Sequence, residues 1–247
     1  MEQPVETLEG WYCLHLFWKL DWAAWKKQPR QVRQLAWDEF EKQLQIWQEN
    51  ETNNHGSSYN FNVVGHKADL GMMLLREKMS DLNQVENSLL KLRLFDFMTE
   101  VNSFVSVTEV GTYGGKPHND RGWQYVNQHL MPILPKKPYI CFYPMNKARK
   151  NGANWYTLPY ADRKEMMHEH GFIGRKYAGK IWQFITGAIA FDDQEWGVTL
   201  FAEDPLVFKK IVTEMRYASA SAIYGDFPYF ICGSYLNTAK LKDFLLI

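Results

Sequence analysis

The chain has 247 residues, 46% of them hydrophobic, and its 28 Lys and Arg balance 28 Asp and Glu to a formal net charge of zero. This balance excludes the broad positive surface of a nucleic-acid-binding protein, and no apolar run reaches the ~20 residues that span a bilayer. The N-terminal residues lack a signal pattern, so we expect a cytoplasmic protein with neither nucleic acid nor a membrane as partner.

The first part of the chain predicts the order strand, helix, strand, strand, helix, strand. Alternating apolar residues mark four strands, at 11–18, 59–63, 70–76 and 103–110. Apolar residues recur at helical spacing over residues 31–49. Ser80 is a natural N-cap for the second helix, because its hydroxyl can accept a hydrogen bond from the first turn.

The same order recurs in the second part. Four segments have the apolar pattern of strands: 138–145, 181–190, 195–202 and 227–234. A helix is expected over residues 160–170, and Asp204 followed by Pro205 is a typical helix start. Two copies of β-α-β-β-α-β are the ferredoxin-like plan. We therefore predict an α+β fold of two ferredoxin-like halves, residues 1–110 and 137–247, with antiparallel sheets packed together.

Residues 111–136 join the two halves. Gly114, Gly115, Pro117 and Pro132 predict a largely irregular segment. A connection of this length inside a compact chain is either mobile or functional.

The three cysteines, Cys13, Cys141 and Cys232, are odd in number and widely spaced. This spacing argues against a disulfide framework and against a cysteine-based zinc site. Each cysteine lies in an apolar, strand-like run, so we predict three buried thiols.

Residues 139–196 combine histidine, tyrosine and tryptophan with many cations. Eight basic residues crowd part of this stretch: Lys147, Arg149, Lys150, Arg163, Lys164, Arg175, Lys176 and Lys180. They form either a solvated surface or a site for a small polyanion. His170 before a glycine is by itself typical of a helix end, and His168 competes with it for any ligand role. Strand alternation puts Tyr143 and Met145 on one face.

Many separated blocks agree in order and spacing with one known family. They are Gly10–His15, Tyr143–Lys147, Asn154–Tyr156, His170-Gly171, Gly174–Lys180, Gln183, Ile185–Gly187, Glu195–Phe201, Glu214–Arg216 and Ser221-Ala222. In these blocks the chain resembles the coproheme decarboxylases of Gram-positive bacteria, haem-dependent peroxidases of the chlorite-dismutase-like superfamily. Only residues 111–128 depart from the resemblance.

The resemblance implies a tandem ferredoxin-like fold, usually a homopentamer, that binds iron coproporphyrin III (coproheme). It implies hydrogen-peroxide-dependent oxidative decarboxylation of two propionates of this porphyrin to give haem b. Iron coproporphyrin III is then both substrate and redox cofactor, and its four propionates can use several of the crowded cations. In the family the segment matching residues 111–136 lies over the haem site, which implies a lid.

The family's functional residues carry over position by position. Tyr143 matches the reactive catalytic tyrosine, Lys147 the catalytic lysine that binds the reacting propionate, and His170 the axial iron ligand. Gln183 matches a distal residue near the iron. The other positions implied to bind the porphyrin are Met145, Asn146, Trp155, Arg175, Arg216 and Ser221, with Tyr113 and His129 in the connecting segment.

Two departures from the family favour alternative hypotheses. His129 and Ile223 stand where the family has arginines, and an imidazole lacks the fixed fork of donors of a guanidinium. These changes favour a haem- or coproheme-binding or transfer protein with little turnover. A chlorite-dismutase-like peroxidase is a further alternative, although it requires an arginine where Gln183 stands. The last alternative hypothesis is a metal-free, dimeric α+β protein that acts only by binding other proteins.

Overall fold

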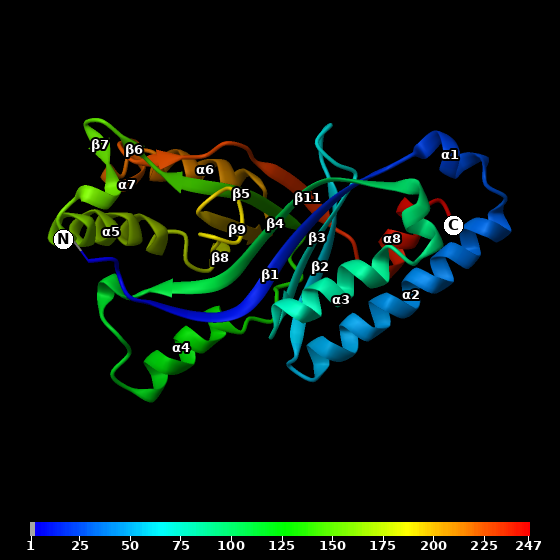
Figure 1. Ribbon diagram of the computed structural model, residues 1–247, viewed down its shortest axis with the longest axis horizontal. Coiled ribbons are helices and arrows are strands. Elements are labelled where there is room, and N and C mark those ends of the chain that lie inside the picture. Colours follow the sequence, from blue (N-terminus) through cyan, green and yellow to red (C-terminus); the bar gives the residue numbers. More distant parts are fainter. Residues whose placement is uncertain (1–2) are drawn as a thin grey trace. The chain divides into compact units, whose positions relative to one another are not determined.

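The computed structural model describes residues 3–247, which divide into two compact units. Unit 1 contains the described residues up to Gly10 together with residues 106–131 and 137–232. Unit 2 contains residues 11–105, 132–136 and 233–247. Two long strands, β1 (Thr7–Leu20) and β4 (Met98–Gly111), contribute residues to both units (Figure 1). Within the described part of the chain, every helix is too short or too polar to cross a membrane.

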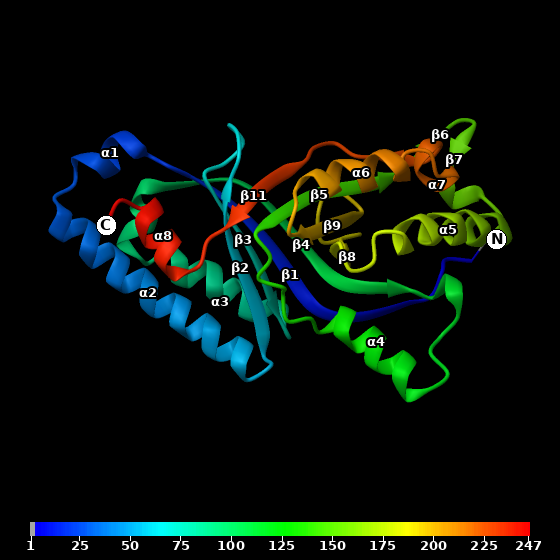
Figure 2. The same cartoon turned by 180° about the vertical axis from the view of Figure 1, so that it is seen from behind.

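Unit 2 is built on an antiparallel sheet. Its strands follow one another in the order β11 (Ile231–Tyr235), β2 (Gly56–Val63), β3 (Leu70–Arg76), β1 and β4. The helices of this unit are α1 (Trp22–Lys27), α2 (Arg30–Thr52), α3 (Met79–Leu89) and α8 (Thr238–Phe244), with a 3-10 turn, η1 (Arg93–Phe97), before β4. In Figures 1 and 2, α2, α3 and α8 lie on one side of this sheet.

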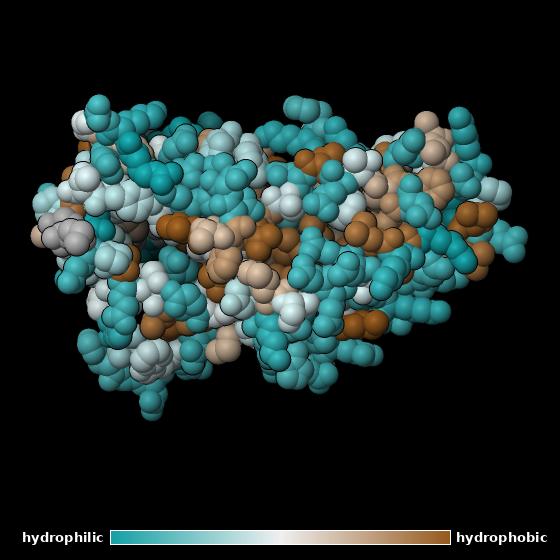
Figure 3. Space-filling view, viewed as in Figure 1, coloured by the Kyte–Doolittle hydropathy of each residue, from teal (hydrophilic) through white to brown (hydrophobic). Residues whose placement is uncertain are grey.

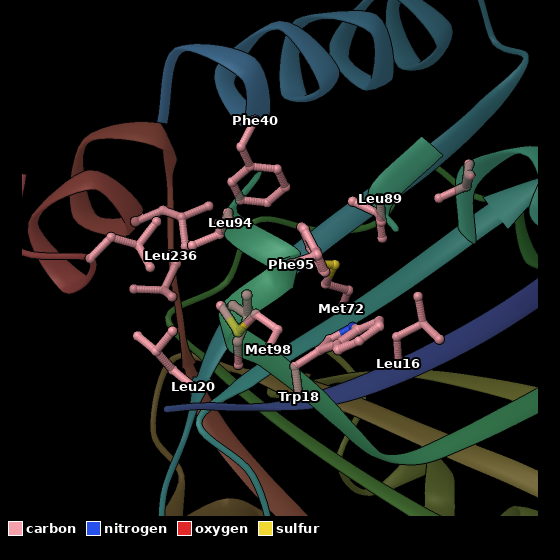
Figure 4. Close-up of a cluster of buried hydrophobic side chains, with 14 of the residues drawn as sticks. Leu16, Trp18, Leu20, Phe40, Met72, Leu89, Leu94, Phe95, Met98 and Leu236 are labelled. Atoms are coloured by element: carbon pink, nitrogen blue, oxygen red, sulfur yellow. The ribbon is translucent and has the colours of Figure 1, made fainter. Parts of the chain in front are cut away.

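The hydrophobic core of unit 2 fills the space between the sheet and these helices. One sheet face contributes Leu14, Leu16, Trp18, Leu70, Met72 and Leu74. From α2 come Trp37, Phe40 and Trp47, whose spacing puts them on one helical face. Figure 4 shows the Phe40 ring pointing from α2 toward Phe95, with ring centroids 5.7 Å apart. Burying each such side chain stabilises the fold by about 1.5–3 kcal/mol, so this cluster anchors unit 2.

Unit 1 contains a second set of antiparallel strands, in which β9 (Trp196–Ala202) lies between β5 (Tyr139–Lys147) and β8 (Ile181–Gly187). The end of β5 also pairs with β10 (Gly225–Asp226). The main helices of this unit are α5 (Tyr160–Arg175) and α6 (Leu206–Met215), and α6 lies along β5 and β9 (Figure 1). Shorter elements gather beside α5: β6 (Arg149–Lys150), β7 (Ala153–Asn154), η3 (Trp155–Thr157) and α7 (Ser219–Ala222) (Figure 2).

The main elements follow the predicted order twice. The first series is β1, α2, β2, β3, α3 and β4, and the second is β5, α5, β8, β9, α6 and β11. The α+β class with antiparallel pairing is therefore confirmed. Several boundaries move by a few residues: β8 ends at Gly187, β11 begins at Ile231, and α5 continues to Arg175.

The expectation of a largely irregular segment at 111–136 is wrong, because this segment contains helix α4 (Asp120–Leu130). Asn119 caps the helix, its side chain accepting a hydrogen bond from the Gly122 amide at 2.9 Å. Val126 and Leu130, four residues apart, are buried. The glycines and prolines precede and follow this helix, so their clustering concealed it.

Two smaller predictions are also corrected. Ser80 is not the N-cap of α3: the helix begins at Met79 after an extended Lys78, and the Ser80 hydroxyl bonds to Asp81 instead. The N-cap of α6 is Pro205, although the Asp204 carboxylate does accept a hydrogen bond from the Leu206 amide (2.9 Å).

The prediction of three buried thiols holds for Cys13 and Cys141 but is wrong for Cys232, which is exposed. Cys232 lies on β11, on the opposite side of the strand from its buried neighbours Ile231 and Gly233. The surface is otherwise mixed in polarity. Figure 3 shows hydrophilic side chains over most of the viewed face, with hydrophobic residues scattered among them.

Candidate functional site

Lys147 places a cation inside unit 1, at the end of β5, where it is only 8% exposed. Its Nζ donates a hydrogen bond to the Ala220 carbonyl oxygen (2.8 Å) and lies 4.4 Å from the Trp155 ring centroid. Among residues 3–247, no carboxylate forms an ion pair with this ammonium. Burial lowers the pKa of Lys147 to about 8, against a smaller opposing effect of Glu195. A buried cation held by a carbonyl and a ring is suited to bind an anion.

His170 is a half-buried residue on α5. Burial and, to a smaller extent, the positive charge of Lys147 lower its pKa to about 4, while the charge of Glu169 opposes the shift. The imidazole is therefore neutral at physiological pH. Its Nδ1 is buried and has no hydrogen-bond partner within residues 3–247. A neutral imidazole with such a nitrogen suits a transition-metal ligand, whereas His168 on the same helix is exposed.

Tyr143 and Gln183 lie on the same face of the three strands β5, β9 and β8, because directly paired residues share a face. One row of paired residues is Cys141, Leu200 and Gln183, and the next is Tyr143, Val198 and Ile185. The Tyr143 ring packs against Phe230 and Phe227, with centroids 4.7 and 5.8 Å away. Burial raises the pKa of Tyr143 well above its usual value, so the phenol keeps its proton. Gln183 is an amide on an otherwise apolar face.

Trp155 belongs to a second buried cluster, beside Lys147. Ala220 and Tyr224 complete its buried part, and Tyr113 packs against it from η2 (Thr112–Gly114). The Tyr113 ring also stacks on Tyr160, with centroids 5.7 Å apart. Ser221, the residue after Ala220 on α7, is itself buried. The structure thus brings together the predicted site residues Lys147, Trp155, Tyr113 and Ser221.

Asn146 and Met145 lie where β5 meets β9. The Asn146 amide donates to Gln194 Oε1, and its carbonyl oxygen accepts from the Glu195 amide (3.0 Å). Met145 is half-buried and pairs with Trp196 across the two strands. The polar atoms of Asn146 therefore hold the β8–β9 connection, a structural role beside the predicted porphyrin contact.

Arg175 and Arg216 are exposed cations at the ends of α5 and α6. The Arg216 guanidinium lies 5.6 Å from the Phe227 ring centroid, and Phe227 in turn contacts Tyr143. Arg216 is thus at the edge of the Tyr143 cluster, where an exposed guanidinium can reach a carboxylate.

The structure does not bring His129 to these residues. His129 is near the end of α4, where Nδ1–H donates to the Tyr125 carbonyl oxygen (2.8 Å). Its ring lies 6.4 Å from that of Phe184, which is on the face of β8 opposite Gln183. Ile223, the other departure from the family, is 52% exposed just after α7.

Sequence reasoning assigned no role to Glu195, although the structure buries it against the site. Glu195 is 7% exposed, and its Oε2 accepts a hydrogen bond from the Lys147 amide (2.7 Å). The signals in the sequence were its place in the matched block Glu195–Phe201 and an acidic residue directly before a strand. Such a residue is usually solvated, so its burial was not predictable.

The chain is similar to known proteins over almost its full length. Residues 33–236 match the family described as chlorite dismutase. A coproheme decarboxylase from Staphylococcus saprophyticus is 48% identical, with 98% of each chain covered. The solved structure of a heme-binding protein from Thermus thermophilus has a TM-score of 0.96 at 43% identity, covering 100% of this chain and 99% of that one.

A variant of chlorite dismutase from Candidatus Nitrospira defluvii is a more distant relative in structure. It has a TM-score of 0.79 at 18% identity, covering 96% of this chain and 97% of that chain. At this identity the likeness shows the fold alone. It confirms the predicted fold class, and the matches together confirm the resemblance found in the sequence.

Proposed function

Because the chain belongs to the chlorite dismutase family, we propose that it is a coproheme decarboxylase, which converts iron coproporphyrin III to haem b by oxidative decarboxylation of two propionates. The observation that carries this proposal is the buried Lys147 ammonium, which has no carboxylate partner among residues 3–247 and lies close enough to His170 for its charge to lower the pKa of that imidazole. A cation for a propionate and a donor for iron are thus within electrostatic range of each other.

The residues of unit 1 fit an iron porphyrin. His170 would ligate the iron, since its imidazole is neutral and has a buried nitrogen without a partner in residues 3–247. Lys147 would bind one propionate, and Arg216, Arg175 and Ser221 are available for others. Gln183 and Tyr143, on one sheet face, would face the porphyrin from the strand side.

Bound iron coproporphyrin III supplies the redox chemistry, with hydrogen peroxide as the proposed oxidant. In each of the two reactions a propionate, a proton and one peroxide give a vinyl group, carbon dioxide and two waters. Lys147 Nζ would hold the carboxylate of the reacting propionate in place. Tyr143 Oη would give up a hydrogen atom and then take one from the propionate chain. Loss of one further electron from the chain, also to the peroxide oxidant, would complete the two-electron oxidation and release carbon dioxide. Its raised pKa keeps the phenol protonated until that step.

The test is to mix the purified protein with iron coproporphyrin III, titrate hydrogen peroxide and follow the porphyrin masses. Successive loss of two carboxyl groups, with one peroxide consumed for each, is the expected result. Bleaching without vinyl products would contradict the proposal. Tight binding of coproheme without decarboxylation would instead support a binding or transfer protein. The replacement of two family arginines by His129 and Ile223 favours that alternative.

We also propose a cytoplasmic location and a homopentameric assembly, both on the family resemblance. Sedimentation equilibrium of the purified protein tests the pentamer, and a monomer at all concentrations would contradict it. Fractionation of cells tests the location.

A further inference from the structure

Glu195 is a buried carboxylate that the proposed reaction does not use. It directly precedes β9, and its Oε2 accepts a hydrogen bond from the main-chain N–H of Lys147 (2.7 Å). Its own N–H donates to Asn146 Oδ1 (3.0 Å). The other carboxylate oxygen is 3.8 Å from Nη1 of Arg149, whose side chain is 70% exposed. The hydrogen bond of Glu195 to the Lys147 amide is therefore short and buried, whereas its ion pair with Arg149 is long and involves an exposed side chain.

The hydrogen bond to Lys147 takes the place of a missing strand partner. The register of β5 and β9 ends with the pair Met145 and Trp196, two residues before Lys147. On its other edge the Lys147 main chain pairs with Gly225 of β10. A buried N–H without a partner is unfavourable, and the Glu195 side chain supplies that partner. The main chain at Lys147 is thus held on the β9 side by this hydrogen bond and on the β10 side by the next residue, because the Ala148 N–H donates to the Tyr224 carbonyl oxygen (2.7 Å).

We propose that Glu195 is a positioning residue for Lys147: its hydrogen bond fixes the Lys147 main chain, so that Nζ lies between the Ala220 carbonyl and the Trp155 ring. The identity of the anion that Lys147 binds, a porphyrin propionate, rests on the proposed function. The positioning itself rests on the geometry of the chain. Burial and then the Glu195 carboxylate raise the pKa of Tyr156, the residue after Trp155, so the same carboxylate also acts on the segment carrying the ring.

Two substitutions separate the hydrogen bond from the charge. Glu195→Gln keeps an oxygen that can accept from the Lys147 amide, whereas Glu195→Ala removes it. If Glu195 acts by positioning, the Gln variant should resemble the wild type. If it acts through its negative charge alone, the Gln variant should resemble the Ala variant, and the proposal is wrong.

The first measurement uses the protein without porphyrin. Competitive labelling of amines with acetic anhydride, read by mass spectrometry, reports the accessibility of each lysine. Lys147 should label slowly in the wild type and in Glu195→Gln, and roughly tenfold faster in Glu195→Ala. This readout does not depend on coproheme, so it tests the positioning even if the proposed function fails. Equal labelling of Lys147 in the wild type and the Ala variant would overturn the proposal.

The second measurement is the dissociation constant of iron coproporphyrin III. Glu195→Ala should weaken binding by roughly tenfold in the wild-type background. In a protein that already carries Lys147→Met, Glu195→Ala should weaken binding no further. A general disturbance of the fold would instead weaken binding in both backgrounds. If Glu195→Ala does not fold, Glu195→Asp replaces it, because aspartate keeps the negative charge on a side chain too short to reach the Lys147 amide. This variant should also show faster labelling of Lys147 and weaker binding of iron coproporphyrin III.

The chain offers a matched control at the other end of β9. Glu203 pairs with Lys137 (2.9 Å), and the Lys137 ammonium lies 4.0 Å from the Trp182 ring centroid. Glu203, Lys137 and Trp182 are the same residue types as Glu195, Lys147 and Trp155, but the Glu203 side chain is 65% exposed. Glu203→Ala should leave both the labelling of Lys147 and the affinity for iron coproporphyrin III unchanged.

Discussion

Lys147 and His170 lie close enough in unit 1 for the ammonium charge to lower the pKa of the imidazole. The effect adds to that of burial, and together they bring the pKa to about 4. A protonated imidazole cannot ligate a metal, because both of its nitrogens carry hydrogen. The cation proposed to bind a propionate therefore also helps to keep the proposed iron ligand in its neutral form.

The first prediction concerns the iron ligand. His170→Ala should abolish the spectroscopic signature of histidine-ligated iron when coproheme is added, as followed in the Soret band and by resonance Raman. His168→Ala is the matched control, since His168 is on the same helix but exposed. Loss of the signature in the His168 variant, with retention in the His170 variant, would reverse the assignment.

The second prediction concerns pH. With the Lys147 pKa lowered to about 8, the ammonium is present before binding only below that pH. A bound propionate favours the charged form, so above pH 8 binding must take up a proton. Coproheme affinity should therefore be level below about pH 8 and fall above it, by as much as roughly tenfold per pH unit. Titrations of iron coproporphyrin III at several pH values measure this.

Lys147→Met is the control for the pH dependence. Methionine is similar in length but has no ammonium, so this variant should bind more weakly and lose the decline above pH 8. A decline of the same steepness in the variant would show that another group is responsible.

The sequence predicted the repeated order of elements because burial on one face leaves a clear periodicity. The helix over residues 31–49 became α2, with Trp37, Phe40 and Trp47 buried as expected for one apolar face. The matched blocks likewise pointed to residues 139–221. Helix α4 was not predicted, because only two of its residues, Val126 and Leu130, are buried and prolines precede and follow it in the sequence.

The contacts within the site were less predictable, because they depend on which residues the fold brings together. No pattern indicated that the Ala220 carbonyl would accept the Lys147 hydrogen bond, as the two residues are far apart in the chain. The burial of Glu195 is a second example. The pairing of β5 with β9 stops at Trp196, so the side chain of the adjacent Glu195 is buried against the unpaired N–H of Lys147. The sequence alone does not show where this pairing stops.

The third prediction concerns Tyr143. Tyr143→Phe keeps the ring that packs against Phe227 and Phe230 and removes only the phenol. Coproheme binding and thermal stability should persist, while the yield of vinyl products falls by roughly a hundredfold or more. Tyr139→Phe, on the same strand face, should leave the yield unchanged. A normal haem b yield from the Tyr143 variant would remove this residue from the mechanism.

The fourth prediction tests the core of unit 2. Phe40 is fully buried and contacts Trp37, Trp47 and Phe95. Phe40→Ala should lower the free energy of unfolding by about 3–5 kcal/mol, because it removes a large apolar side chain and leaves a cavity. Leu35→Ala on the same helix should change it little, since Leu35 is 46% exposed. Urea denaturation followed by circular dichroism gives both values, and equal losses would contradict the packing described for α2.

The last prediction concerns His129, which the resemblance places at a porphyrin-binding arginine position. In the structure its Nδ1–H is engaged by the Tyr125 carbonyl, and its ring lies against Phe184, on the opposite face of β8 from Gln183. With His129 in this position, His129→Arg should leave the affinity for iron coproporphyrin III unchanged between about pH 6 and pH 8, the range in which an ordinary histidine titrates. Arg216→Ala is the comparison, because a guanidinium at the edge of the Tyr143 cluster should contribute roughly tenfold in affinity. Stronger and less pH-dependent binding by the His129→Arg variant would mean that α4 brings this position to a propionate when coproheme is bound.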